Sequence, residues 1–202
     1  MRSLRKIMHL SIVGLIFASP TSNAEEGRRA SGTTIEEIVV TAQKREESIN
    51  DVGMSIQAST GEQLKDLGIT DAFDLYKAVA GFSSNVNYAG TAIYTIRGIG
   101  FQENSLATSP TVSVYLDEAP LQFSPMTRAA SLDVQRVEAL KGPQGTLFGQ
   151  NATGGAVNFI ANKPTSEFEA GVTVSYGEFD SFDIDGFVSG PINEAWSYRL
   201  AL

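Results

Sequence analysis

Cysteine and histidine, which often act in catalysis and bind transition metals, are almost absent from this chain of 202 residues. It has no cysteine, and its single histidine is His9, so beyond the first residues it offers neither a thiolate nor an imidazole. Zinc sites and most nucleophilic hydrolases need those groups. Asp183 and Asp185 share one face of a candidate strand and could bind a cation, but the polar face of an amphipathic sheet explains them more simply. We expect no catalytic residue, no metal site and no cofactor.

Two glycine patterns resemble nucleotide-binding loops but lack the residues that such loops need. Gly98 and Gly100 open a GxGxxG pattern, yet Glu103 occupies the position of the third glycine and no helix pattern follows. The segment from Gly142 to Gly149 lacks the lysine and serine that would contact phosphates and magnesium. The sequence therefore argues against ATP hydrolysis and, with the missing nucleophiles, against an enzyme.

The first 24 residues predict export. Arg2, Arg5 and Lys6 precede an apolar run from Ile7 to Ala18, and Ser22-Asn23-Ala24 has small residues where a signal peptidase cleaves. The run is about 12 residues long, short of the ~20 that a spanning helix requires. We expect cleavage after Ala24. An uncleaved membrane anchor is the alternative.

The charge that remains after cleavage is strongly negative. Loss of the three basic leader residues leaves 12 of the 15 basic residues against 23 acidic ones, a net charge of −11. A nucleic-acid partner is therefore not expected.

The stretch from Val134 to Pro164 alternates short apolar strands with glycine-rich turns. Strand patterns cover Val134 to Leu140 and Ala156 to Ile160. Five glycines lie between or at the edge of these strands and can adopt positive φ or let another backbone approach: Gly142, Gly145, Gly149, Gly154 and Gly155. Because apolar residues are interleaved with them, a tight ordered loop is favoured over a flexible linker.

The region before this stretch predicts a small mixed sheet with short helices. Thr60 to Gln63 forms a capping-box pattern, and Gly68 ends the two-turn helix that follows. Thr70 is expected to cap a second helix that ends at Gly81. Its predicted apolar face consists of Phe73, Tyr76, Val79 and Ala80. Strands are expected at Ala92 to Arg97 and Val112 to Leu116.

A short β-prone run precedes all of these elements. Residues Ile35 to Gln43 lie between a polar stretch, Glu25 to Thr34, and the charged run Lys44 to Glu47. The run can extend but has little sequence nearby with which to form a sheet, so we expect an exposed strand that pairs with the edge strand of another protein. The alternative is a first strand of the following domain.

Period-two alternation recurs three times after Pro164. Apolar and polar residues alternate over Ala170 to Tyr176, Phe182 to Ser189 and Trp196 to Leu202, with turns expected at Gly177 to Asp180 and Gly190 to Glu194. This pattern predicts an antiparallel meander with one apolar face. Membrane strands with an aromatic girdle at Tyr176, Trp196 and Tyr198 and a soluble sandwich both fit the pattern.

Three blocks occur in the order and spacing of the plug of a TonB-dependent outer-membrane receptor. They are IRGIG at Ile96 to Gly100, VSVYLDEAPL at Val112 to Leu121, and the block from Val134 to Ile160, which is similar to VERVEVLKGPQGTLYGxNATGGAINI. With the leader and EEIVVTA, which resembles the TonB box, the resemblance covers Met1 to Pro164. It implies a signal peptide (1–24), a flexible N-terminus with the box near 36–43 (25–47), an α+β plug (48–164) and the start of a transmembrane β-barrel (165–202).

The resemblance also implies roles for particular residues. The box residues that would bind the periplasmic domain of TonB are Glu37, Ile38, Val39, Val40, Thr41 and Ala42. Arg97 and Lys141 occupy positions whose basic side chains face acidic groups of the barrel in the family, and an ordinary solvated charge is the alternative for both. The residues that resemble ligand-facing plug loops are Asn85, Tyr88, Phe101, Gln102 and Phe123, for which a plain solvent-exposed loop is the alternative.

For the function, the resemblance implies import across the outer membrane with energy from the TonB inner-membrane complex. Ferric siderophores are the commonest ligands of the family, but cobalamin, nickel chelates and oligosaccharides also fit. A complete barrel would have about 22 strands and contact lipid, so three strands imply an N-terminal fragment. A signalling receptor is disfavoured, because Glu25 to Thr34 is too short for an extra domain before the box. A truncated non-functional product or a soluble plug-like binding module is the alternative.

Overall fold

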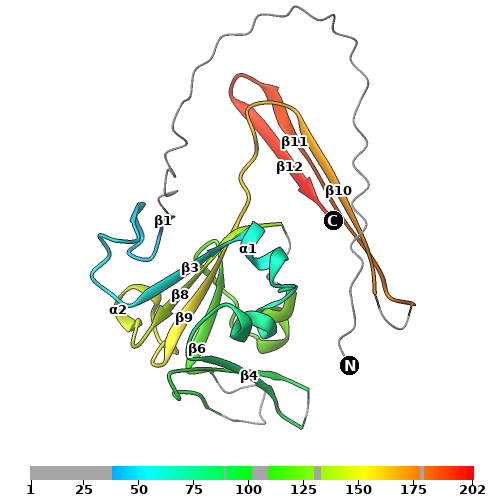
Figure 1. Ribbon diagram of the computed structural model, residues 1–202. Helices are drawn as coiled ribbons and strands as arrows, with labels where there is room; N and C mark the ends of the chain where they lie inside the picture. The colour runs from blue at the N-terminus through cyan, green and yellow to red at the C-terminus, as the bar shows by residue number, and fades with distance from the viewer. Residues whose placement is uncertain (1–37, 89, 102–108, 130–132, 178–179) are drawn as a thin grey trace, which may run out of the picture.

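A five-stranded mixed sheet forms the centre of the first and larger part of the chain (Figure 1). The computed structural model describes residues 38–88, 90–101, 109–129, 133–177 and 180–202. The strand order is β3-β8-β9-β6-β7. The bounds are Ile56–Thr60 for β3, Val112–Leu116 for β6, Ala119–Pro120 for β7, Val134–Lys141 for β8 and Gly155–Ala161 for β9. Strands β6 and β9 run parallel and the other neighbours run antiparallel. The expected mixed sheet is confirmed.

Both faces of this sheet are covered, because its central strands carry apolar residues at odd and even positions. In β8, Val137 and Ala139 face one core while Leu140 faces another. The first core also contains residues from the helices and from a separate hairpin, whereas the second contains residues from the segment before β3. Buried on two sides, the sheet is a rigid platform on which an N-terminal segment can dock.

The first helix is positioned by the capping box that its sequence predicts. Helix α1 spans Gly61–Asp66, and the Thr60 side chain accepts a hydrogen bond from the Gln63 N–H while the Gln63 side chain caps Thr60 in return. Gly68 follows in the left-handed conformation, with φ of 61°. Within the described residues, no helix has the length and apolar character needed to cross a membrane.

The second helical segment differs from its prediction in type and in buried face. It is a 3-10 helix, η1, over Ala72–Lys77, and its N-cap is Asp71 rather than Thr70. Leu75 is fully buried, whereas Tyr76 is 52% exposed and does not belong to the core. Of the expected apolar face, Val79 belongs to the first core and Phe73 packs against it, as predicted, whereas Tyr76 and Ala80 are exposed. Three residues per turn, instead of 3.6, rotate successive side chains differently.

A hairpin of β4 (Phe82–Val86) and β5 (Ala92–Ile96) lies at the lower end of the plug in Figure 1. It packs on η1, and a second 3-10 helix, η2 (Ser124–Ala129), packs against β5. The hydroxyl groups of Tyr94 and Thr127 lie 3.0 Å apart in a buried hydrogen bond. Strand β5 begins where predicted and ends one residue earlier.

The glycine-rich connection between β8 and β9 is ordered, as predicted. It contains a single-turn helix, α2 (Gly145–Phe148), and its Gln144 N–H donates to the Ala152 carbonyl over 2.8 Å. Ala152 and Phe148 are both buried in the second core. The loop therefore closes one end of the platform instead of extending into solvent.

After the plug, three antiparallel strands form a long meander that stands apart in Figure 1. They are β10 (Glu169–Tyr176), β11 (Phe182–Asn193) and β12 (Trp196–Ala201). The meander is confirmed, but the turn expected at Gly190 to Glu194 is misplaced. Strand β11 continues to Asn193 through an irregularity in the register between Pro191 and Asn193, and the turn is formed by Glu194 and Ala195.

One face of the meander is apolar and solvent-exposed. Cross-strand pairs on this face include Val174 with Ile184 and Tyr176 with Phe182, and all four side chains are exposed. Thr173 with Asp185 and Ser175 with Asp183 form the pairs of the opposite face. Phe182 and Tyr176 are 60% and 65% exposed, so a continuous apolar surface lacks a covering layer within the described residues.

Candidate functional site

The β-prone N-terminal run is docked against the plug and already has a strand partner. We call its described residues, 38–42, the box segment. Strand β1 (Val39–Val40) pairs antiparallel with β2 (Glu47–Ser48), and the Ile49 N–H donates to the Ile38 carbonyl over 3.0 Å. Glu37 lies outside the described residues. The expectation of an exposed strand without a partner is therefore wrong for this structure.

Alternate side chains of the box segment enter the second core. Val40 and Ala42 are completely buried, whereas Val39 points outward and is 45% exposed. Their neighbours come from four parts of the plug and include Tyr115, Leu140, Phe148 and Ala156. Ile49, Val52 and Met54 pack against the same cluster. The charged run Lys44 to Glu47, taken as a flank from sequence, turns the chain so that these later apolar residues complete the cover.

A buried glutamate of the sheet holds the centre of the box segment. Glu138 lies in the middle of β8 and is completely buried. Its Oε1 accepts a hydrogen bond of 2.8 Å from the Thr41 backbone N–H, and the Thr41 hydroxyl lies 3.3 Å from the same oxygen. Arg136, two residues earlier on the same face, donates from Nε over 2.8 Å and supplies the countercharge. One carboxylate thus satisfies a box amide that would otherwise be buried without a partner.

The sequence interpretation missed Glu138. A glutamate between Val137 and Ala139 would be assigned to a solvent-facing side of a strand, because buried carboxylates are rare. Its partner Thr41 is 97 positions away in the sequence. The sequence signal for Glu138 is a single acidic residue within the apolar run Val137 to Leu140, and that signal does not identify a partner.

A second contact holds the turn after the box segment. Lys44 has a left-handed backbone conformation, and its Nζ lies 3.0 Å from a carboxylate oxygen of Glu118 and 4.7 Å from the Phe148 ring centroid. Both charged side chains are about one-third exposed. A partly exposed ion pair contributes about 0–1 kcal/mol, so this contact orients the turn more than it stabilises the docking.

The structure brings Arg97 and Lys141 together at the start of β3. Arg97 donates from Nη2 to the Ser55 hydroxyl over 2.6 Å, and Lys141 donates from Nζ to Gln57 Oε1 over 2.9 Å. Burial, and then the neighbouring Arg97 charge, lower the pKa of Lys141. Neither residue forms an ion pair with a carboxylate of the described residues. Arg97 is exposed and Lys141 is half-buried, so the structure leaves open both the barrel contact and the solvated charge that the sequence allowed.

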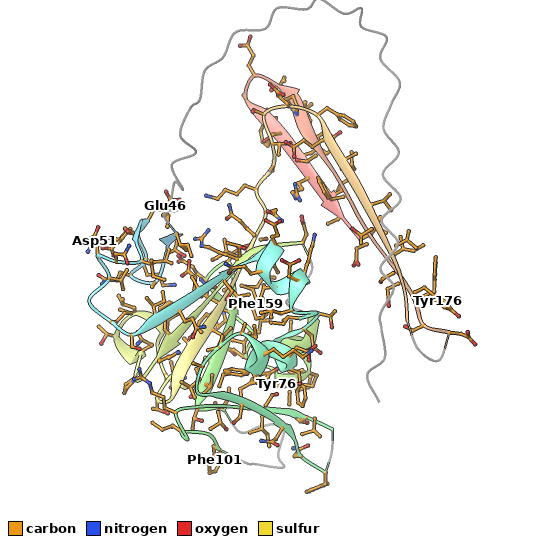
Figure 2. The ribbon with its side chains drawn as sticks, in the orientation of Figure 1. Glu46, Asp51, Tyr76, Phe101, Phe159 and Tyr176 are labelled. Carbon is orange, nitrogen blue, oxygen red and sulfur yellow. The ribbon has the colours of Figure 1, made fainter. Side chains whose placement is uncertain are left out.

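The residues expected in ligand-facing loops are exposed and lie away from the box segment. Tyr88 is 86% exposed, and Asn85, Phe101 and Phe123 are also exposed. Phe101 lies beside the β4–β5 hairpin in Figure 2, whereas Glu46 and Asp51, which flank the box partner strand, lie at the opposite side. Gln102 lies outside the described residues. Two surfaces of the plug are thus separated by its sheet and cores.

Comparison with protein families matches this geometry to a known domain. The family described as TonB-dependent Receptor Plug Domain matches residues 48–156, more than half of the chain. The chain belongs to the TonB-dependent receptor family. Members of this family are non-enzymatic transporters.

Individual relatives agree with this assignment. The pesticin receptor of Yersinia pestis is 30% identical over 201 residues, which cover 96% of this chain and 28% of that receptor. The ferric yersiniabactin uptake receptor of Yersinia pestis, known from a crystal structure, is 30% identical, with a TM-score of 0.62. The match covers 73% of this chain and 24% of the receptor chain.

A more distant structure shows the shared fold. The pyoverdine outer membrane receptor of Pseudomonas aeruginosa, bound to pyoverdine, has a TM-score of 0.65 at 23% identity and covers 81% of this chain and 24% of its own. This chain spans less than a third of the length of these relatives. The plug domain and the antiparallel strands that follow it correspond to the N-terminal part of these receptors.

Proposed function

We propose that this chain provides the TonB box, the plug and the first wall strands of an outer-membrane receptor that imports a ferric siderophore. The named ligands of two similar receptors, ferric yersiniabactin and pyoverdine, support this ligand class. The exposed apolar face of β10–β12 supports contact with outer-membrane lipid, since membrane strands alternate apolar and polar residues. A protein with this role passes through the periplasm after its leader is removed.

The observation that carries the proposal is the docking of the box segment through a small number of contacts. It is held by a two-residue ladder, two buried apolar side chains and the carboxylate of Glu138. These contacts are few enough to be exchanged for another strand. In the mechanism that we infer, ligand binding at the exposed loops favours the released box, and the periplasmic domain of TonB then pairs with its backbone as an added strand.

In this mechanism Arg97 and Lys141 hold the plug to the wall. Their clustered positive charge would face acidic groups on the inside of the barrel, and the bonds of Arg97 to Ser55 and of Lys141 to Gln57 place both cations at the start of β3. The ligand would contact the opposite surface, around Asn85, Tyr88, Phe101, Gln102 and Phe123. Ligand and energy source thus act on different sides of one platform.

A peptide experiment tests the box assignment. We expect a peptide of residues 36–43 to bind the periplasmic domain of TonB and to add a strand to it, which NMR would detect as cross-strand contacts between the two backbones. A peptide carrying Val40→Pro should bind roughly tenfold or more weakly, because proline removes one N–H donor and restricts φ. A Val39→Thr peptide, which keeps the backbone donors, is the matched control. Absence of a backbone-paired complex with the native peptide would refute the assignment.

A further inference from the structure

The plug and the meander are connected by a short linker, residues 162–168, and polar contacts fasten it at both ends. At the plug end, Asp133 precedes β8 and Asn162 follows β9. The Asn162 N–H donates to the Asp133 carbonyl over 2.9 Å, and its side-chain amide donates to Asp133 Oδ1 over 2.9 Å. At the meander end, the Thr165 N–H donates over 3.0 Å to the hydroxyl of Ser189, which is completely buried and donates to the Tyr198 carbonyl.

An arginine of the last strand closes this connection. Arg199 of β12 binds Asp133 through both carboxylate oxygens, with Nε–Oδ2 and Nη2–Oδ1 distances of 2.5 and 2.6 Å. The side chains of Arg199 and Asp133 are 10% and 17% exposed, and the guanidinium lies 4.2 Å from the Phe187 ring centroid. Paired, stacked and largely removed from water, this interaction differs from a surface ion pair, which usually contributes little.

The electrostatics keep this carboxylate charged. Hydrogen bonds from Arg199 lower the pKa of the Asp133 carboxyl below its ordinary value, against the opposing effect of burial. Asn162 and the Arg199 charge act in the same direction.

We propose that Asp133 and Arg199 form a fixed joint that positions the plug on the strands of the wall while the box segment on the other face is free to move. This proposal deepens the proposed function by assigning the immobile end of the plug. Tension on the box would pass through the following residues to β3, which pairs with β8 from Ile56 to Thr60. The tension would arrive at Ile56, opposite Leu140, and Asp133 immediately precedes the other end of β8, so the joint would hold that far end in place.

The joint is separate from the cations carried over from the family. Lys141 ends β8, whereas Asp133 precedes its first residue. Arg199 belongs to the chain itself, 66 residues after Asp133, and needs no partner from outside. Arg199 lies on the same face of the meander as Ser189 and Phe187, and this face is opposite the exposed apolar face.

Proteolysis of the linker in the full 202-residue chain, in detergent micelles, tests the joint. Endoproteinase Glu-C cleaves after acidic residues, and Glu167 is exposed within the linker. We expect Asp133→Asn and Arg199→Lys each to increase the cleavage rate after Glu167 roughly tenfold, since both remove the bidentate pair. The double variant should cleave no faster than either single variant, because both act through one interaction.

The lysine variant separates a joint from a general charge effect. Arg199→Lys keeps the charge but loses the paired geometry, so cleavage at the native rate in this variant would overturn the proposal. The proposal would also be overturned if the double variant were cleaved faster than either single variant, with a rate increase equal to the product of the two single increases. A thiol introduced as Val40→Cys reports the docked box segment and must stay protected in each variant, which shows that the plug remains folded. If Asp133→Asn exposes that thiol, the cleavage rate of Arg199→Lys alone is used to test the proposal. The peptide experiment does not involve these residues, so the two proposals fail independently.

Discussion

Replacement of Glu138 by alanine is expected to release the box segment from the plug. The change removes the acceptor of the Thr41 N–H and leaves Arg136 without its anion. Hydrogen bonds to charged groups contribute about 1.5–3 kcal/mol, and a buried donor without a partner adds a cost of similar size. Because Arg136 is 14% exposed and can turn toward water, we expect a loss of about 2 kcal/mol in docking, or roughly a 30-fold change in the docking equilibrium.

The absence of native cysteine makes this release directly measurable. A Val40→Cys variant carries one thiol at a completely buried position, and a Val39→Cys variant carries one at a position that is 45% exposed. In the Glu138→Ala background, the maleimide labelling rate of Cys at position 40 should rise roughly 30-fold. The rate at position 39 should change little. Equal protection of position 40 with and without the carboxylate would show that Glu138 does not hold the box segment.

Conservative substitutions divide the effect between its two parts. Thr41→Val removes only the hydroxyl, whose distances to the Glu138 oxygens are 3.3 and 3.4 Å, and should have a small effect. Glu138→Gln keeps an oxygen acceptor but loses the charge that Arg136 balances, so it should fall between wild type and alanine. This order follows from the backbone N–H being the main donor.

The elements that sequence predicts best are those whose signals are local. Thr60 and Gln63 are three residues apart and cap one helix, and β6 has the predicted bounds because four of its five residues are apolar and β-prone. In η1 the apolar positions can be recognised from the sequence. Whether the segment forms an α-helix, with 3.6 residues per turn, or a 3-10 helix, with three, depends on its packing. That difference alone moved Tyr76 from the expected core to the surface.

Contacts between distant segments are the part that sequence did not predict. The box segment looked unpartnered because its ladder with β2 is only two residues long, too short to leave a period-two pattern. Thr41 with Glu138 and Asp133 with Arg199 join residues 97 and 66 positions apart. The sequence shows the polar residues of each pair, but only the fold shows which of them contact each other. The roles of the box, of Arg97 and Lys141 and of the loops remain predictions.

Three glycines, two between β8 and β9 and one at the first position of β9, should differ widely in the stability lost when each is replaced by alanine. Gly155 has φ of 150°, and a Cβ there would lie 2.4 Å from the Leu140 carbonyl oxygen and 2.8 Å from Ile96 Cδ1. Backbone strain and overpacking each cost about 1–3 kcal/mol, so Gly155→Ala should lose about 3 kcal/mol or more. The carbonyl belongs to the neighbouring strand of the platform and cannot move away without breaking the ladder.

The other two glycines are the matched controls for this prediction. Gly149 has φ of 77° and ψ of −165°, a backbone region that essentially only glycine adopts, and no atom lies within 4 Å of its added Cβ, so alanine should cost only the backbone strain, about 1–3 kcal/mol. Gly145 begins α2 and also has open space, so alanine there should be neutral or stabilise by up to about 1 kcal/mol. Urea unfolding of the three variants, monitored by circular dichroism, measures the free energy of unfolding that each one loses. Similar losses at positions 145 and 155 would contradict the close approach of β8 to β9, and with it the rigid platform on which the box segment docks.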